Sequence, residues 1–340
     1  KTGDTVRRVF YPLRIRSSQT ISAKNAESIK DAAQSAIRLT DVKQTREQLL
    51  ETIRKCYSFL PEYKNIPHFK LLEFGRREIL SEPRKPAENR NRMIADDLLF
   101  LGLYDEGTPE FEIGRLTSSG DKEPEKSTNL TDDEKFTLAV YYARGDMANR
   151  AAAFIEPVWR KIPDDYQIEL LPREQIELLY PVPYRAALLQ HSAPRDLDPR
   201  FLLSIMRQES RFPADVKSVS AARGLMQFIS STSNQIAVEL GKDDFRQDDL
   251  YHPPTAILFG SQYLSNLFHQ FTEQPQAVAA SYNGGEENMS RWYARSNSND
   301  PDRYVPEILY SQSKDYVFKV MQNYRIYKML YTEDLEPVEE

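Results

Sequence analysis

The chain has a single cysteine and few glycines among its 340 residues. Because a disulfide needs two thiols, Cys56 excludes any disulfide within the chain and any cysteine metal cluster. The 12 glycines disfavour glycine-rich phosphate loops and turn-dense all-β folds, and favour a mainly helical protein. The four histidines are scattered, and none belongs to an HExxH or HxH pattern. We therefore expect no metal and no cofactor.

Long apolar runs and a basic charge balance are also absent. No stretch approaches 18 consecutive apolar residues, so no membrane-spanning segment is predicted. The net charge of −6 argues against a general nucleic-acid binder, although it is compatible with a local basic groove. Charged residues make up 28% and hydrophobic residues 40%, which is typical of a globular chain. The chain begins at Lys1 without a methionine or an apolar signal core, and we expect a mature protein or a fragment.

The first half is predicted to consist of helices joined by polar loops. Apolar residues recur at helical spacing in the stretches 24–39, 43–60, 68–80, 92–103, 107–116, 132–144 and 147–160. Gly102 and Gly145 each separate an apolar helix end from a new helix, which is typical of an αα-hairpin. Two such hairpins favour a stacked, α-superhelical array. The polar stretch 117–132 is expected to be a solvated loop within it.

A proline-rich stretch, 161–184, marks the expected domain boundary. Proline ends helices and stiffens connections. We therefore predict a helical scaffold region over residues 1–175 and a second domain over residues 176–335, which is long enough for a core of its own.

One carboxylate is placed on an apolar stripe at the start of this second domain. Asp198 and Pro199 suit the N-cap and the first position of a helix. Leu202, Ile205 and Met206 follow at helical spacing, and the next position on that stripe is Glu209. Burial there would raise the carboxyl pKa, as a general acid requires. The alternative is a frayed helix end, with Glu209 paired to a neighbouring arginine.

An ordered set of motifs runs over roughly residues 180–331. Its members are Glu209-Ser210, Ser218, Gly224-Leu225-Met226-Gln227, Tyr282-Asn283, Glu307 to Tyr310, and Lys314 to Val317. This set resembles the pattern of a known family, the soluble lytic transglycosylases of bacteria: E-S at a helix end, a loop serine, G-L-M-Q, A-Y-N, and a later E-x-I-P-Y-x-E-T-R-x-Y-V stretch. The resemblance implies a mainly α protein, with a superhelical region followed by a goose-lysozyme-like helical catalytic domain.

The resemblance implies cleavage of the β-1,4 bond between N-acetylmuramic acid and N-acetylglucosamine in peptidoglycan, without water and with 1,6-anhydromuramic ends. Glu209 would act first as acid and then as base. The predicted substrate-binding residues are Ser210, Ser218, Gly224, Met226, Gln227, Tyr282, Asn283, Glu307 and Tyr310. Location in the periplasm or cell envelope follows from this substrate, as does binding to glycan strands rather than nucleic acid. The helical half would guide a glycan strand or bind a cell-wall protein.

The chain departs from the family pattern at several positions. These are Ser281 for Ala, Ala221 for Gly, Leu309 for Pro, and Gln312, Ser313 and Lys314 for Glu, Thr and Arg. Two alternatives therefore stay open: a hydrolase of the same fold that uses Glu286 or Glu287 as a second carboxylate, and a degenerate glycan-binding scaffold. The sequence leaves open exo or endo action, the need for peptide stems, lipid anchoring and oligomeric state.

Aromatic residues are dense in the C-terminal stretch, and sugar rings stack on such side chains. We expect glycan subsites among Tyr282, Trp292, Tyr293, Tyr304, Tyr310 and Tyr316. The helical spacing of Tyr324, Tyr327 and Tyr331 predicts core packing instead.

Overall fold

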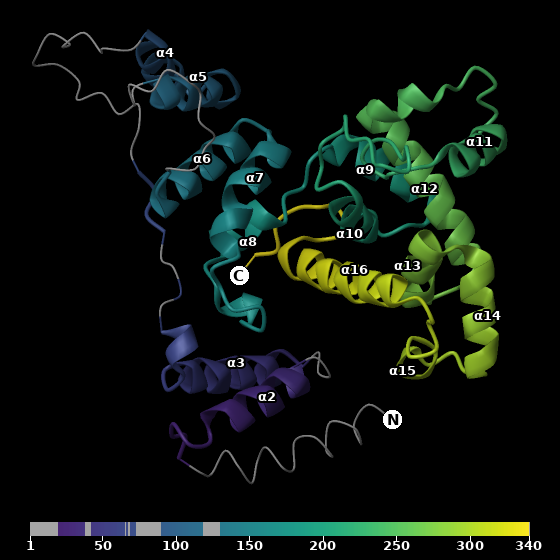
Figure 1. Ribbon diagram of the computed structural model, residues 1–340, viewed down its shortest axis with the longest axis horizontal. Helices are drawn as coiled ribbons and strands as arrows, with labels where there is room; N and C mark the ends of the chain where they lie inside the picture. Colours follow the sequence, from purple (N-terminus) through teal and green to yellow (C-terminus); the bar gives the residue numbers. More distant parts are fainter. Residues whose placement is uncertain are drawn as a thin grey trace, which may run out of the picture. The chain divides into compact units, whose positions relative to one another are not determined.

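The structure, a computed structural model, describes residues 20–37, 42–64, 66, 69–72, 90–117 and 130–339 (Figure 1). Regular structure in this part of the chain is helical, and extended segments pair only in isolated bridges. The predicted mainly α fold class is confirmed. Most of the predicted helix 68–80, and most of the predicted loop 117–132, lie outside the described residues.

The chain divides into two units, Lys1–Leu179 and Tyr180–Glu340. This division falls within the proline-rich stretch, a few residues beyond the boundary that we predicted. No helix in the described residues is both long enough and apolar enough to cross a membrane.

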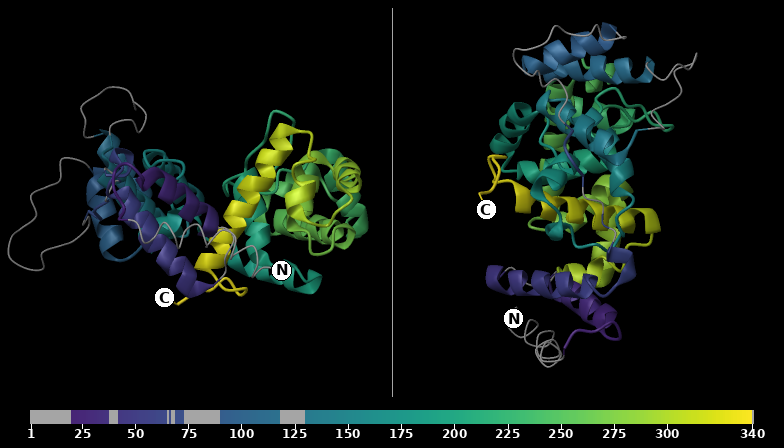
Figure 2. Two further views of the ribbon diagram at one scale, coloured as in Figure 1. Left: turned by 90° about the horizontal axis from the view of Figure 1, so that it is seen from below. Right: turned by 90° about the vertical axis from the view of Figure 1, so that its left-hand side faces the viewer.

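Consecutive helices of the first unit pack as hairpins. The pairs are α2 (Ala26–Ile37) with α3 (Lys43–Tyr57), α4 (Arg90–Phe100) with α5 (Tyr104–Thr117), and α6 (Asp132–Arg144) with α7 (Ala148–Trp159). The short helix α8 (Arg173–Leu179) contacts α6 and α7. The α2–α3 pair is visible in both views of Figure 2. The predicted array of helical hairpins is thus observed within this unit.

The two glycines predicted to close these hairpins act differently. Gly102 has φ +77°, the left-handed conformation that glycine adopts without strain. Gly145 has φ −91°, and the left-handed residue is its neighbour Asp146 with φ 56°. A Cβ on Gly145 would lie 2.7 Å from the backbone nitrogen of Asp105. Gly145 thus ends α6, as predicted, and the close packing against the start of α5 leaves room only for glycine there.

The proline-rich stretch is more than a connection. It contains the 3₁₀ turn η2 (Ile168–Leu170) and helix α8, both in the first unit. Just before η2, Asp165 accepts hydrogen bonds from Lys30 Nζ at 2.6 Å and from the hydroxyl of Tyr63. Lys30 also donates to the Tyr63 oxygen at 2.8 Å. This network ties the first part of the stretch to α2, within the first unit, to which residues up to 175 were assigned in our prediction.

The second unit is built around helix α10 (Pro199–Glu209). Its helices are α9 (Arg185–Ser192), α10, α11 (Ser230–Glu239), α12 (Pro253–Gln270), α13 (Pro275–Gly284), α14 (Glu286–Ser296), α15 (Pro301–Tyr304) and α16 (Ser311–Leu330), with 3₁₀ turns η3 (Ala193–Arg195) and η4 (Gln247–Tyr251). Helix α10 packs on α9, α12 and α16, and its first eight residues are buried. The chain at the end of α10 is therefore fixed by packing on several sides.

Candidate active site

Helix α10 carries Glu209 at its last position. Asp198 caps the helix start by accepting from the backbone N–H of Arg200 at 2.8 Å, as predicted. The stripe residues Leu202, Ile205 and Met206 have no exposed surface. The same stripe brings the carboxyl group of Glu209 into a buried environment.

Burial raises the pKa of Glu209 from its ordinary value near 4.5 to about 7, against a smaller opposite effect of a hydrogen bond from Tyr316. The Tyr316 hydroxyl donates to Glu209 Oε1 at 2.5 Å. The group is therefore a carboxylic acid that remains partly protonated at neutral pH, which allows it to give and take a proton.

The chain turns sharply after Glu209. The hydroxyl of Ser210 donates to the Met206 carbonyl at 3.2 Å and accepts from the N–H of Phe212 at 3.0 Å. Arg211 and Phe212 both have positive φ, 56° and 80°, and Phe212 is buried. Ser210, predicted to bind substrate, thus holds the helix end in the structure, and the buried Phe212 ring anchors the turn.

A tight loop follows and holds Ser218 and Gln227. Isolated bridges join Lys217 to Arg223 and Arg223 to Phe228. Ser218 Oγ accepts from the N–H of Ala222 at 3.1 Å. Gln227 Nε2 donates to the carbonyls of Gly224 at 2.8 Å and Val216 at 3.3 Å. Hydrogen bonds within the loop therefore fix both side chains.

Two backbone positions in this loop favour glycine. Gly224 has φ +73°, and a Cβ there would lie 2.0 Å from the carbonyl oxygen of Leu250. Its predicted close approach is thus to η4. Ala221 has φ 61°, in the region where glycine is unstrained, which is the residue the family has at this position.

Met226 is placed in the core. Its side chain is fully buried and packs on Gly260 of α12, where a Cβ would meet Met226 Cε at 2.7 Å. The predicted contact of this side chain with substrate is therefore wrong. Its backbone still takes part in the site, because the Met226 carbonyl accepts from the Tyr282 hydroxyl at 2.8 Å.

Tyr282 belongs to an aromatic group next to Glu209. Its ring lies 5.4 Å from Tyr263 and 5.9 Å from Phe228, centre to centre. Burial, with a further contribution from the charge of Glu209, raises the pKa of Tyr282 well above 10. The phenol is therefore neutral at physiological pH, and the interaction places Glu209 and Tyr282 in one electrostatic environment.

The remaining predicted residues lie on α13 and on the segment before α16. Asn283 is exposed and its Oδ1 accepts from Ser313 Oγ at 2.8 Å. Glu307 Oε2 accepts from Arg295 Nε at 2.7 Å. Tyr310 is half exposed and its ring meets Trp292 edge-on at 5.2 Å.

Several departures from the family pattern have a clear local role. Ser313 holds Asn283, and Ser281 is fully buried with its hydroxyl on the Ala277 carbonyl. Lys314 Nζ donates to the carbonyl of Pro306 at 2.8 Å. Leu309, in contrast, is 67% exposed, and nothing in the structure explains it.

The predicted aromatic subsites are only partly accessible. Tyr304 has no exposed surface, and Trp292 and Tyr316 are buried. These side chains are core residues, so the expectation of sugar stacking on them was wrong. Tyr327 and Tyr331 are buried as predicted, whereas Tyr324 is partly exposed.

Tyr316 was predicted as a glycan subsite and not as the hydrogen-bond partner of Glu209, although a signal for that role existed. It lies on the buried face of α16 with Val317 and Val320, just as Glu209 lies on the buried face of α10. For Tyr316 and for Glu209, a polar group on an apolar stripe indicates a buried partner. Tyr263 is a further residue that was not predicted; its hydroxyl donates to Glu286 at 3.0 Å.

No group of three or more potential metal ligands occurs in the described part of the chain. The site residues placed by the structure are one acid, its tyrosine partner and a set of hydrogen-bonded amide and hydroxyl groups.

Comparison with known proteins shows what the second unit resembles. Residues 188–305 match the family model of the transglycosylase SLT domain. The resemblance inferred from the sequence is thus confirmed over this region.

Two curated relatives align with less than half of the chain. The soluble lytic murein transglycosylase of Salmonella typhimurium is 28% identical over 150 residues, which cover 44% of this chain and 23% of the relative. A putative soluble lytic murein transglycosylase of Haemophilus influenzae is 30% identical over 131 residues, which cover 38% of this chain and 22% of the relative. The alignments thus span about a quarter of the length of these relatives.

Solved structures extend the similarity in fold over nearly the whole chain. The 70 kDa soluble lytic transglycosylase of Escherichia coli matches with a TM-score of 0.55 at 17% identity, over 96% of this chain and 51% of that one. An inactive mutant of the lytic transglycosylase Slt from Pseudomonas aeruginosa matches with a TM-score of 0.53 at 17% identity, over 87% of this chain and 45% of that one. At these identities the likeness shows a shared fold.

Proposed function

We propose that this chain is a peptidoglycan lytic transglycosylase. The buried carboxyl of Glu209, with a pKa of about 7 and a tyrosine hydroxyl bonded to it, is the observation that carries the proposal. The SLT domain and the curated relatives support the substrate class, a murein glycan. The mutant in the Pseudomonas structure, described as inactive, replaces a glutamate with glutamine, which supports a glutamate as the essential acid.

The proposed reaction needs one carboxyl group. Protonated Glu209 gives its proton to the glycosidic oxygen, and the bond from that oxygen to C1 of N-acetylmuramic acid breaks. The Glu209 carboxylate then takes the proton of the C6 hydroxyl as O6 bonds to C1. The 1,6-anhydro ring forms, water is not consumed, and Glu209 is protonated again. A pKa near neutrality suits both steps, because neither protonation state is strongly favoured.

The surrounding residues would position the sugar. Asn283, exposed beside Glu209's neighbour Tyr282, and the loop side chains Ser218 and Gln227 offer amide and hydroxyl groups to N-acetyl substituents. Glu307, already paired with Arg295, would order this edge of the site rather than attack the sugar. A murein substrate also implies that the chain works outside the cytoplasm, in the bacterial envelope.

Digestion of purified sacculi tests the proposal. Mass spectrometry of the products should show anhydro ends, one water lighter than hydrolytic ends. Glu209→Gln should bind glycan and lose activity about a thousandfold, in the range of a lost general acid and base. Glu339→Gln is the matched control, because Glu339 is exposed and belongs to no candidate site, and it should keep activity. Nearly full activity in Glu209→Gln would contradict the assignment.

A hydrolase is the second candidate, and one contact favours it. Glu286 accepts from Tyr263, whose ring packs on Tyr282, so a second carboxylate lies at the edge of the aromatic group. In a hydrolase Glu286 would activate water. Reducing ends in the product, together with a large loss of activity in Glu286→Gln, would establish this alternative.

A further inference from the structure

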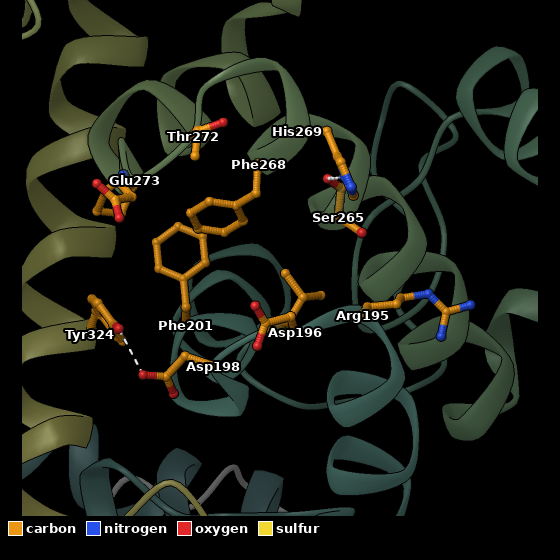
Figure 3. Close-up of a pocket in the computed structure, with 12 residues that line it drawn as sticks. Arg195, Asp196, Asp198, Phe201, Ser265, Phe268, His269, Thr272, Glu273 and Tyr324 are labelled. Carbon is orange, nitrogen blue, oxygen red and sulfur yellow. Dashed lines mark hydrogen bonds between the residues drawn. The ribbon is translucent and has the colours of Figure 1, made fainter.

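A pocket of about 550 Å³ opens in the second unit near the start of α10 (Figure 3). Phe201 lines it, eight residues before Glu209, or about 12 Å along the helix axis. Its lining residues are Arg195, Asp196, Leu197, Asp198, Phe201, Ser265, Phe268, His269, Thr272, Glu273, Pro275 and Tyr324. None of them is a predicted site residue. Its volume is in the range of small-ligand sites.

Aromatic rings form the inner part of this pocket. Phe201 meets Phe268 edge-on at 5.3 Å and Tyr324 edge-on at 5.3 Å. Phe201 is buried beneath the other two rings, which are partly exposed. The floor therefore offers apolar and π surface to a ligand rather than hydrogen-bonding groups.

Two free carboxylates flank the rings. In Figure 3 the side chains of Asp196 and Glu273 lie on opposite sides of Phe201 and Phe268. Both residues are exposed, and within the described residues neither carboxylate makes a hydrogen bond or an ion pair; the backbone N–H of Asp196 donates to the Ala193 carbonyl. Asp198, in contrast, is occupied by Arg200 and by the Tyr324 hydroxyl at 2.7 Å.

The positive groups nearby are directed elsewhere. Arg195 Nε donates to Gln262 at 3.0 Å, and in Figure 3 its guanidinium points away from the rings. The Nδ1 of His269 lies 2.7 Å from the Ser265 carbonyl. Lys328, which is not a lining residue, lies 4.6 Å from the ring centre of Tyr324. That contact shows that an ammonium group is accommodated by a ring of this cluster.

We propose that this pocket binds a protonated alkyl amine of about the size of a lysine side chain. The methylene arm would pack on the partly exposed rings of Phe268 and Tyr324, where it loses contact with water. The ammonium group would reach the carboxylate of Asp196 or of Glu273 at the two sides of the rings, where charge-assisted hydrogen bonds are available. The assignment does not depend on the activity at Glu209.

The direct test is binding of Nα-acetyl-lysine N-methylamide to the full 340-residue chain, followed by NMR. Shifts should gather in the amides of residues 195–201 and 265–275. Nα,Nε-diacetyl-lysine N-methylamide has the same arm without the charge and should bind about tenfold more weakly, in keeping with the loss of charged hydrogen bonds. Equal binding of the two probes, or shifts elsewhere, would overturn the proposal.

Variants distinguish binding by the pocket carboxylates from an effect of the chain's net charge. Asp196→Asn with Glu273→Gln should weaken the lysine probe about tenfold and leave glycan cleavage unchanged. Asp243→Asn, at an exposed position in the turn after α11, is the control and should bind the probe normally. Loss of binding in this control as large as in the double variant would count against the pocket.

The source of the amine is identified with sacculi. In a Glu209→Gln background, retention on sacculi should fall when their free amines are acetylated if the wall polymer supplies the ligand. Unchanged retention, with the probe still bound, supports the same pocket and assigns its ligand to a soluble amine. Failure of cleavage with intact probe binding would remove the proposed function alone.

Discussion

Each unit of this protein contains a carboxyl group that accepts a hydrogen bond from a tyrosine hydroxyl, but the pKa of that carboxyl group is lowered in one unit and raised in the other. In the first unit, burial tends to raise the pKa of Asp165, but hydrogen bonds from Lys30 and Tyr63 outweigh it and the pKa is lowered. In the second unit, burial raises the pKa of Glu209 to about 7, and the hydrogen bond from Tyr316 opposes it only in part. Glu209 therefore becomes a proton donor because its carboxyl group is buried and no cation stabilises its charge, whereas the Asp165 side chain is 48% exposed and is paired with Lys30.

The difference should appear first in the pH dependence of stability. The folded chain keeps Glu209 protonated where the unfolded chain is ionised, so stability falls as pH rises from about 4.5 to 7. Across this window the contribution is about 3 kcal/mol. The unfolding free energy of Glu209→Gln should thus exceed that of the wild type increasingly as pH rises, measured in urea.

Asp165 should give the opposite slope. Because its pKa is lowered on folding, its stabilisation is present above the ordinary value near 3.8 and is lost as pH falls through the folded pKa. A stability difference for Glu209→Gln that is constant with pH, or that shrinks toward pH 8, would refute the contrast between the two acids.

Removal of the acid in the first unit should cost stability and leave chemistry intact. Asp165→Ala leaves the Lys30 ammonium, whose side chain is 6% exposed, without its main partner. We expect a loss of about 1–3 kcal/mol, measured by hydrogen exchange in peptides from α2 and α3. Asp31→Ala is the control, since Asp31 is exposed and lies 3.4 Å from the same ammonium.

Substitution of Tyr316, in the second unit, should change the rate of glycan cleavage rather than the stability of the fold. Tyr316→Phe removes the hydrogen bond that lowers the pKa of Glu209, so that pKa should rise further. We expect activity to fall about tenfold, the equivalent of one hydrogen bond to a charged group, and the alkaline limb of the pH–rate profile to move to higher pH.

Tyr324→Phe provides the comparison on the same helix. Tyr324 donates to Asp198, at the opposite end of α10 from Glu209. Its removal should leave the pH–rate profile in place. If Tyr324→Phe moved the pH–rate profile as far as Tyr316→Phe does, the packing of α16, and not the hydrogen bond from Tyr316, would set the pKa of Glu209.

The smallest effect is expected at the tyrosine of the first unit. Tyr63→Phe removes the hydrogen bonding of its hydroxyl to Asp165 and the hydrogen bond that it accepts from Lys30, while Lys30 still holds the carboxylate. The unfolding free energy should fall by about 1 kcal/mol, with no change in activity. Tyr166→Phe, a substitution in the same stacked cluster, should be close to neutral; an activity loss in either variant would contradict the separation of the two networks.

The sequence was informative where local chemistry decides the structure. Asp198 and Pro199 identified the start of α10, and helical spacing placed Glu209 on its buried face. Both follow from propensity and periodicity, which act within one element. The hairpin order of the first unit was predictable for the same reason.

Contacts between distant elements were not predictable in this way. Gly145 ends α6 as expected, but the approach of Asp105, which requires glycine there, was not visible in the sequence. Met226 matched a substrate-lining position, yet Gly260 on α12 provides the space that buries it. Tyr316 lies 107 residues from Glu209 along the chain, so their hydrogen bond is visible only after folding.

The hydrogen bond from Tyr282 to the Met226 carbonyl also sets a direction for recognition. The phenol has one proton, and that proton is already directed at the backbone. A ligand that reaches this oxygen finds lone pairs and no donor. Tyr282 is therefore complementary to the hydroxyl and amide N–H groups of a sugar, and mismatched to its carbonyl oxygens. An inhibitor aimed at this position should present a donor.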